Sequence, residues 1–168
     1  MPDIRREPVT VSRQIGASAE AIFAILADPR RHLELDGSGM LRGTDAGAPV
    51  TSVGDVFVMR MHYEALGDYE MNNHVVEYEP NRRVGWEPEA GRGHPGASEV
   101  GERWGHRWVY DLAPDGPGAT VVTETYDVSR VPEEALEYIG GAAVLVDMTR
   151  TLERLDEVCT GRAQRATT

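Results

Sequence analysis

Cysteine is scarce in this chain, and long apolar runs are missing. The 168 residues include a single cysteine, Cys159, which excludes a disulfide within the chain. It ends a helical pattern, where a buried or incidental cysteine is expected rather than a nucleophile. No apolar run approaches the ~18–20 residues of a membrane-spanning helix, and the N-terminal segment lacks the apolar core of a secretory signal. We therefore expect a cytoplasmic protein that does not insert into a membrane.

Basic residues are few as well. Lys and Arg number 17 against 28 Asp and Glu, which gives a net charge of −11, and the basic residues form no block. Nucleic-acid binding needs a basic surface that contacts phosphates, so we expect no nucleic acid among the partners. The acidic surface favours solubility, and we expect a monomer or a homodimer.

Sequence motifs for metals and cofactors are also missing. The five histidines lie in separate segments, and no HExxH or CxxC pattern accompanies them. The sequence has no GxGxxG motif, no P-loop and no GxSxG nucleophile motif. We expect neither a metal nor an organic cofactor.

The overall amino-acid composition is that of one globular domain. Hydrophobic residues make up 40% of the chain and charged residues 27%, as in ordinary folded domains. A chain of this length forms a single core and has room for a modest cavity. We expect one domain over residues 1–160, followed by a disordered tail over 161–168, which is small and polar.

The first third of the chain predicts a strand and two short helices. Polar and apolar residues alternate over Val9–Ile15, as in a half-buried strand. Ser18 is a typical helix cap before the apolar residues at helical spacing, and Pro29 ends that helix. A second short helix is expected over 29–35. The Gly-rich segment 36–54 is then a long connection.

The rest predicts a series of strands that ends in a long helix. Strand patterns are present at 40–42, 55–63, 69–78, 83–86, 103–112 and 120–128. A short helical turn is expected at 132–138, and residues 144–158 have the spacing of an amphipathic helix. The order predicts an α+β fold, in which a curved antiparallel sheet of about six to seven strands wraps around the long C-terminal helix. One helix does not fill such a concave sheet, so a cavity is expected.

Three segments carry a resemblance to a known superfamily. They are IGASAEAIFAILADPRRHLELDGSG, NNHVVEYEPNRRVGWEP and GHRWVYDLAPDGPGATVVTETYDVS. With the final helix, they resemble the START-like, helix-grip (SRPBCC) superfamily, and within it the polyketide cyclase/dehydrase-like proteins of actinobacterial type. The resemblance implies a deep apolar cavity under the C-terminal helix, for lipids, sterols, polyketides or other hydrophobic ligands, usually without a cofactor. A fold that hosts many activities does not name this one. The segment 87–103 is a longer loop than in related sequences, so the cavity mouth is expected to differ.

The predicted strand at 103–112 has the strongest site signal. Its inner face holds Trp104, His106, Trp108, Tyr110 and Leu112. Core packing explains aromatic residues on a strand, and a histidine among them is more often a buried core residue than a catalyst. The alternative is that His106 acts as a general base.

Glu124, on the next strand, is the candidate partner of that base. With a turn at 114–118, Glu124 lies opposite either His106 or Trp108, and in the second case His106 is a diagonal neighbour. Glu124 would then orient the imidazole and raise its basicity. The alternative is a slipped register in which Glu124 faces solvent.

The strand faces and the resemblance together predict a ligand-binding lining. It comprises Phe57, Met59, Met61, Asn73, Trp86, Trp104, Trp108, Tyr110, Tyr126, Met148 and Leu152. Asn73 or Tyr110 would orient the substrate through a hydrogen bond. The methionines are equally explained as core filler.

Three functions remain open from the sequence. The first is an enzyme of the cyclase or dehydratase kind that acts on a polyketide-like substrate by confinement and acid/base catalysis. The second is a non-catalytic carrier or sensor of a lipophilic ligand, which needs only the cavity. The third is a co-chaperone-like module, which the superfamily also contains and which predicts an exposed apolar patch.

Overall fold

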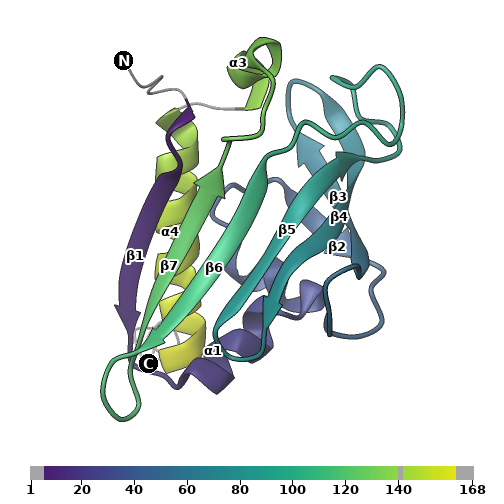
Figure 1. The fold of residues 1–168 in the computed structure, drawn as a ribbon. Helices are drawn as coiled ribbons and strands as arrows, with labels where there is room; N and C mark the ends of the chain where they lie inside the picture. The colour runs from purple at the N-terminus through teal and green to yellow at the C-terminus, as the bar shows by residue number, and fades with distance from the viewer. Residues whose placement is uncertain (1–5, 140–141, 162–168) are drawn as a thin grey trace.

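One antiparallel sheet of seven strands, in the order β1-β7-β6-β5-β4-β3-β2, forms the frame of the molecule (Figure 1). The structure is a computed structural model and describes residues 6–139 and 142–161. The strands are β1 Val9–Ile15, β2 Leu41–Thr44, β3 Val56–Tyr63, β4 Gly67–Glu79, β5 Arg83–Ala90, β6 Arg107–Pro114 and β7 Thr120–Asp127. The helices are α1 Ala19–Leu26, η2 Pro29–Arg31, α2 His32–Leu35, η3 Glu133–Ala135, α3 Leu136–Ile139 and α4 Ala142–Thr160.

This architecture confirms the predicted α+β helix-grip fold. The hydroxyl of Ser18 accepts a hydrogen bond from the Ala21 N–H and caps α1, as its position predicts. Pro29 starts the second short helix. The predicted tail over 161–168 lies, apart from Gly161, outside the described residues.

The long helix α4 runs behind β1 and β7 (Figure 1). The Arg13 Nε atom on β1 lies 2.8 Å from Asp156 Oδ2 on α4, which ties the helix to the sheet edge. The main core joins α1 and the C-terminal half of α4 to the sheet, with Ile22, Leu152 and Leu155 fully buried. A second apolar cluster joins η3, α3 and the N-terminal half of α4 to the β7 end of the sheet.

The boundary between β5 and β6 differs from the prediction. Strand β5 extends four residues beyond Trp86, to Ala90, and β6 begins at Arg107 rather than at residue 103. Beyond the pair Trp86–Trp108, β5 pairs only with β4. Pro88 fits there because β6 no longer pairs with that part of the strand. The connecting loop is therefore 91–106.

The β6–β7 hairpin closes one residue later than predicted. Strand pairing continues to Pro114 opposite Thr120, so the loop is 115–119 rather than 114–118. A hydrogen bond of 2.9 Å from the Asp115 N–H to the Ala119 carbonyl closes it. Moving the loop by one residue shifts each cross-strand partner by two residues.

The expected position of Glu124 is therefore wrong. Glu124 lies opposite Tyr110, one inward-facing position beyond Trp108 and two beyond His106. It nevertheless faces inward and is only 2% exposed, so the solvent-facing alternative is also wrong.

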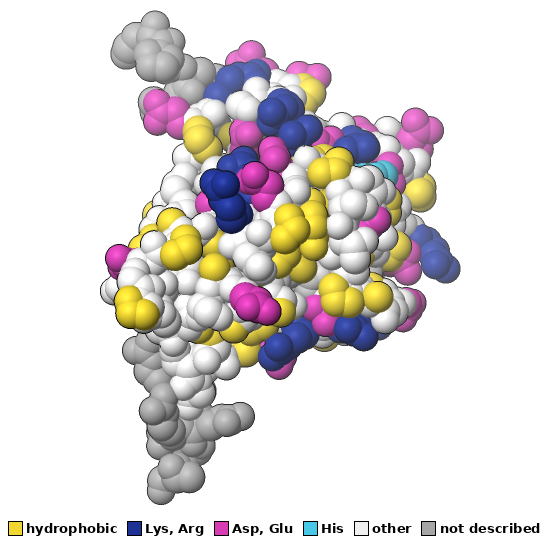
Figure 2. Space-filling model, turned by 60° about the horizontal axis from the view of Figure 1, so that its bottom comes forward, with side chains coloured by type: hydrophobic (Ala, Val, Ile, Leu, Met, Phe, Trp, Pro, Cys, Tyr) yellow, Lys and Arg dark blue, Asp and Glu magenta, His cyan; other side chains and the backbone are white. Residues whose placement is uncertain are grey.

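On the face shown in Figure 2, Lys and Arg side chains lie interspersed with Asp and Glu. Within the described part of the chain, no helix is long and apolar enough to cross a membrane.

Candidate functional site

A cavity of about 880 Å³ lies between the concave face of the sheet and the helices. This volume falls within the range of about 300–1,000 Å³ that is usual for small-molecule sites. Leu26 and Leu35 line it from the α1–α2 side, Ala135 from η3 and Met148 from α4. The predicted lining residues that lie on its wall are Phe57, Met59, Met61, Asn73, Trp86, Trp104, Trp108, Tyr110, Tyr126 and Met148, together with His106 and Glu124.

Leu152 is the predicted lining residue that the structure places elsewhere. It follows Met148 by one helical turn, is 1% exposed and packs in the main core. The amphipathic pattern of α4 does not distinguish Met148 on the cavity wall from Leu152 in the core. It identifies the inward face of the helix, but it does not show where along that face the core ends and the cavity begins.

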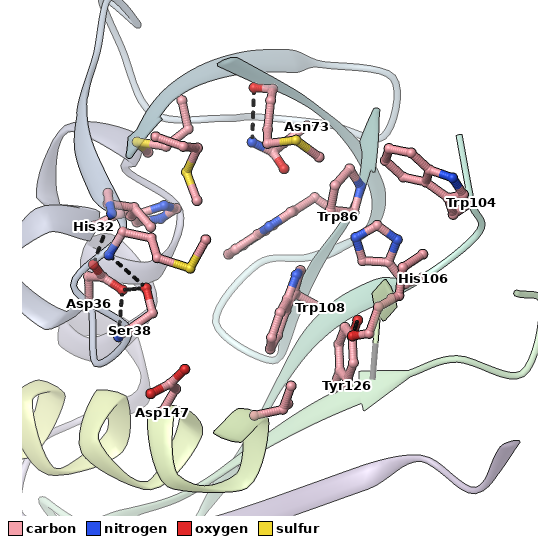
Figure 3. Close-up of a pocket in the computed structure, with 18 of the residues that line it drawn as sticks. His32, Asp36, Ser38, Asn73, Trp86, Trp104, His106, Trp108, Tyr126 and Asp147 are labelled. Atoms are coloured by element: carbon pink, nitrogen blue, oxygen red, sulfur yellow. Dashed lines mark hydrogen bonds between the residues drawn. The ribbon is translucent and has the colours of Figure 1, made fainter. Parts of the chain in front are cut away.

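Aromatic rings form one side of the cavity. Trp86, Trp108 and Tyr126 are consecutive cross-strand partners on β5, β6 and β7. The Trp108 and Tyr126 rings stack with centroids 4.3 Å apart, and the Tyr126 hydroxyl donates to the Ile139 carbonyl at 2.6 Å, which holds α3 over the sheet. Figure 3 shows Trp86, Trp104, His106 and Trp108 grouped on this side.

His106 lies in this aromatic group, just before β6 begins. Its ring centroid is 5.9 Å from that of Tyr126 and 6.3 Å from that of Trp104. Burial lowers the pKa of His106 to about 4, an effect that the charge of Glu87 only partly offsets. The imidazole is therefore neutral at pH 7. Among the described residues, nothing hydrogen-bonds its Nδ1 atom.

Glu124 and Tyr110 form a buried pair on the same wall. The Tyr110 hydroxyl donates to Glu124 Oε1 at 3.0 Å. Burial raises the pKa of Glu124 to about 8, and the Tyr110 hydrogen bond offsets this only in part. The carboxyl group is therefore mostly protonated at pH 7. Its Oε2 atom has no hydrogen-bond partner in the described part of the chain.

His32 is a cavity residue that the sequence analysis did not identify. It lies on the side opposite His106 (Figure 3), and its ring stacks on Trp86 at 5.2 Å. Its Nε2 atom is 2.8 Å from the Leu26 carbonyl, an acceptor only, so Nε2 carries the proton. Burial lowers its pKa. The three-residue spacing of His32 and Leu35, both buried on α2, is the signal that would have found it.

A buried carboxylate holds the 91–106 loop to the sheet. Glu87 on β5 accepts hydrogen bonds from Arg103 Nε at 2.9 Å and from Arg107 Nε at 2.8 Å. Burial alone would raise the pKa of Glu87, but the two guanidinium groups outweigh it and lower the pKa. Trp104 and His94 on this loop line the cavity, so the ion pairs fix part of its wall.

Glu87→Gln is expected to destabilise the protein by about 2 kcal/mol. Losing one partner of a fully buried ion pair costs about 3–5 kcal/mol, and water still reaches the side chains of Arg103 and Arg107, which are 38% and 23% exposed. The free energy of unfolding from urea titration measures this cost. Hydrogen exchange should also speed up at the Ala90 amide, which bonds to the Glu102 carbonyl.

The matched control is Glu99→Gln, which makes the same charge change at an exposed position in the same loop. Its unfolding free energy should stay within about 0.5 kcal/mol of wild type. Equal values for the two variants would contradict the role given to Glu87.

Cys159 and the histidines are not arranged as a metal site in the part of the chain that is described. Burial raises the pKa of the Cys159 thiol to about 11, so the thiol stays protonated near neutral pH. No group of three His, Cys, Asp or Glu side chains within residues 6–139 and 142–161 has the arrangement of a metal site.

Residues 6–160 match the family model described as polyketide cyclase / dehydrase and lipid transport. The uncharacterized protein Rv0088 of Mycobacterium tuberculosis is 38% identical over 122 residues, which is 71% of this chain and 48% of that protein. The chain thus spans about half the length of the curated relatives it matches.

Solved structures share the fold at low sequence identity. A protein from Arthrobacter aurescens matches with a TM-score of 0.68 and 15% identity, covering 96% of this chain and 90% of that one. Ms6760 of Mycobacterium smegmatis matches with a TM-score of 0.66 and 16% identity, covering 93% and 92%. DynU16, a protein of the dynemicin biosynthetic locus, matches with a TM-score of 0.60 and 19% identity, covering 95% of this chain and 49% of that one.

Proposed function

The chain belongs to the polyketide cyclase / dehydrase and lipid transport family, and on that premise we propose that it binds a hydrophobic small molecule in the cavity. We further propose that it acts on a polyketide-like substrate as a cyclase or dehydratase that needs no cofactor. The likeness of its fold to DynU16, whose gene locus serves biosynthesis, supports a biosynthetic role.

One observation carries the proposal. The cavity wall is mainly aromatic and aliphatic, yet two of its buried polar atoms, His106 Nδ1 and Glu124 Oε2, have no hydrogen-bond partner among the described residues. An unpaired buried polar atom costs about 1–3 kcal/mol. A bound molecule with polar groups on an apolar frame would pair these atoms and cover the aromatic wall.

The roles proposed for individual residues follow the geometry. His106 is the candidate base, and Asn73 is a candidate for orienting the substrate because it lies on the cavity wall and is only 6% exposed. Glu124 does not orient His106, since the Trp108–Tyr126 pair lies between their positions in the sheet. The Tyr110 hydroxyl donates its hydrogen bond to Glu124 Oε1, so it is not free to donate to a substrate.

A non-catalytic carrier or sensor is the second candidate function. Two features favour it: His106 and Glu124 form no acid/base pair, and an imidazole with a pKa of about 4 is a weak base. A carrier needs the cavity and its aromatic wall but no proton transfer.

His106→Ala tests catalysis separately from binding. Wild type and variant are incubated with aromatic polyketides, sterols and fatty acids, and native mass spectrometry records both occupancy and the mass of the bound compound. We expect wild type to convert a bound polyketide-like compound and the variant to bind it unchanged, with turnover reduced about 100-fold or more.

The matched control is His62→Ala, which removes an exposed histidine that pairs with Asp68 on the surface. It should convert the compound like wild type. If wild type and His106→Ala bind equally and neither changes the compound, the carrier function is the better account. If no member of the panel binds to wild type, cavity binding itself is contradicted.

A further inference from the structure

Glu124 occupies the end of the cavity that adjoins the main core. The inward positions run from His106, just before β6, through Trp108 and Tyr110 to Leu112 on β6. Leu112 and its partner Val122 belong to the core that packs around α1, so the Tyr110–Glu124 pair is the last polar position on these strands before solid packing. His106, the last residue of the 91–106 loop, lies at the other end of this row. A molecule that fills the cavity therefore meets the Glu124 carboxyl group at its inner end.

Among the residues that the structure describes, the groups around Glu124 supply no positive charge to ionise it. Glu124 lies on β7, and its cross-strand partners are Tyr110 on β6 and Val11 on β1. Arg13, on the same face of β1, is bound to Asp156 of α4. The remaining charged or titratable groups of α2, α4 and the α2–β2 connection on this cavity wall are His32, Asp147 and Asp36. Of these, His32 has a lowered pKa and the other two are acids.

The charged lining of the whole cavity is acidic. Among the described lining residues, the neutral Glu124 apart, Asp36, Glu102, Glu134 and Asp147 stand against a single arginine. That arginine, Arg103, already donates to Glu87. An anionic ligand placed here would lose its hydration and meet several carboxyl groups with no free cation to pair with.

We propose that Glu124 is held as a neutral carboxylic acid and donates a hydrogen bond from Oε2 to a carbonyl oxygen of the bound molecule, so that the cavity selects neutral, carbonyl-bearing hydrophobic molecules over carboxylates of similar size. This rests on the proposed function, in that it assumes the cavity binds a hydrophobic small molecule. The pairing of the two oxygens supports it, because the Tyr110 hydroxyl donates to Oε1 and Oε2 has no partner among the described residues, which leaves Oε2 as the site for the acidic proton. The raised pKa of Glu124 agrees with a proton at that position at neutral pH.

Three matched probes and three proteins test this inference. The probes are 9-fluorenone, fluorene and fluorene-2-carboxylate, which share a ring frame and differ in the polar group. The proteins are wild type, Glu124→Gln, which keeps a donor through its amide, and Glu124→Met, which keeps the length and loses the donor. At pH 6, calorimetric titration of wild type should show fluorenone binding about tenfold more tightly than fluorene, as one added hydrogen bond predicts. The carboxylate should bind most weakly of the three.

The two variants and the pH dependence show whether the preference for fluorenone comes from a hydrogen bond donated at position 124 or only from a polar side chain there. Glu124→Gln should keep most of the preference for the ketone, and Glu124→Met should lose it. In wild type the preference should fall about tenfold as pH rises from 6 to 9.5, since the proton is lost near pH 8. In Glu124→Gln it should not change with pH.

Other binding results would overturn either the inference about Glu124 or the proposed function. If wild type binds fluorene as tightly as fluorenone, or if Glu124→Met keeps the preference while binding fluorene like wild type, the inference is overturned and cavity binding stands. If wild type binds none of the three probes, the proposed function falls with it. Should Glu124→Met fail to fold, the pH profiles of wild type and Glu124→Gln decide the question alone.

Discussion

Glu124→Gln is expected to raise the melting temperature by about 15 °C at pH 9 and to leave it almost unchanged at pH 4.5. The pKa of Glu124 is about 8 in the folded protein, against an ordinary value of 4.5. Below pH 4.5 both states hold the proton. Between pH 4.5 and 8 the unfolded chain releases it and the folded protein does not, so stability falls as pH rises. The full loss is about 5 kcal/mol, and glutamine, which has no proton to lose, avoids it. At about 2–4 °C per kcal/mol, this gives the expected shift.

Thermal melts of both proteins at several pH values measure this difference directly. His106 has the opposite pH dependence, because its folded pKa of about 4 is depressed from 6.5. Its contribution to stability is complete above pH 6.5 and is lost as pH falls toward 4. His106 is present in both proteins, so its effect cancels in the comparison. A stability difference that does not change with pH would show that Glu124 titrates normally.

Gly37→Ala should destabilise the protein by about 3 kcal/mol, the upper end of the usual cost of overpacking. Gly37 is buried where the connection after α2 meets α4, and its N–H donates to the Thr151 hydroxyl at 3.0 Å. An added methyl group would overlap the backbone oxygen of Asp147 and lie 2.7 Å from the Thr151 backbone nitrogen. Backbone atoms of a helix do not move aside as a flexible side chain does. Urea titration measures the change in unfolding free energy.

The matched control is Gly39→Ala, two residues away, where an added methyl group has no neighbour within 4 Å. Gly39 has a φ of +75°, so its substitution is strained, with an expected cost of about 1 kcal/mol. Because the Gly37 contact sets how closely α4 approaches the cavity wall, Gly37→Ala should also weaken ligand binding. Equal costs for the two substitutions would contradict this account of the contact.

The fold could be predicted from the sequence because local signals mark most of its elements. Ser18 caps α1 and Pro29 starts the next helix, and each acts on its own neighbours in the chain. Strand alternation assigned Phe57 and Trp108 to the inner face for the same reason. These signals depend on a few adjacent residues and do not require knowledge of the tertiary structure.

The candidate site could be predicted only in part, because it depends on register and on long-range contacts. His106 and Glu124 were correctly placed on the inner face, but a one-residue shift of the 115–119 loop decides which side chain Glu124 meets. The sequence near Pro114 fits either loop. The ion pairs of Glu87 with Arg103 and Arg107 join positions 16 and 20 residues apart across a long loop, and no local pattern connects them.

The distribution of tryptophan has a practical consequence. The chain contains three tryptophans, and Trp86, Trp104 and Trp108 all line the cavity. Their intrinsic fluorescence therefore comes entirely from the cavity wall, with no tryptophan elsewhere to dilute it. Any molecule that enters will change the polarity or quenching around these indoles, so unlabelled protein can report its own occupancy in a simple titration.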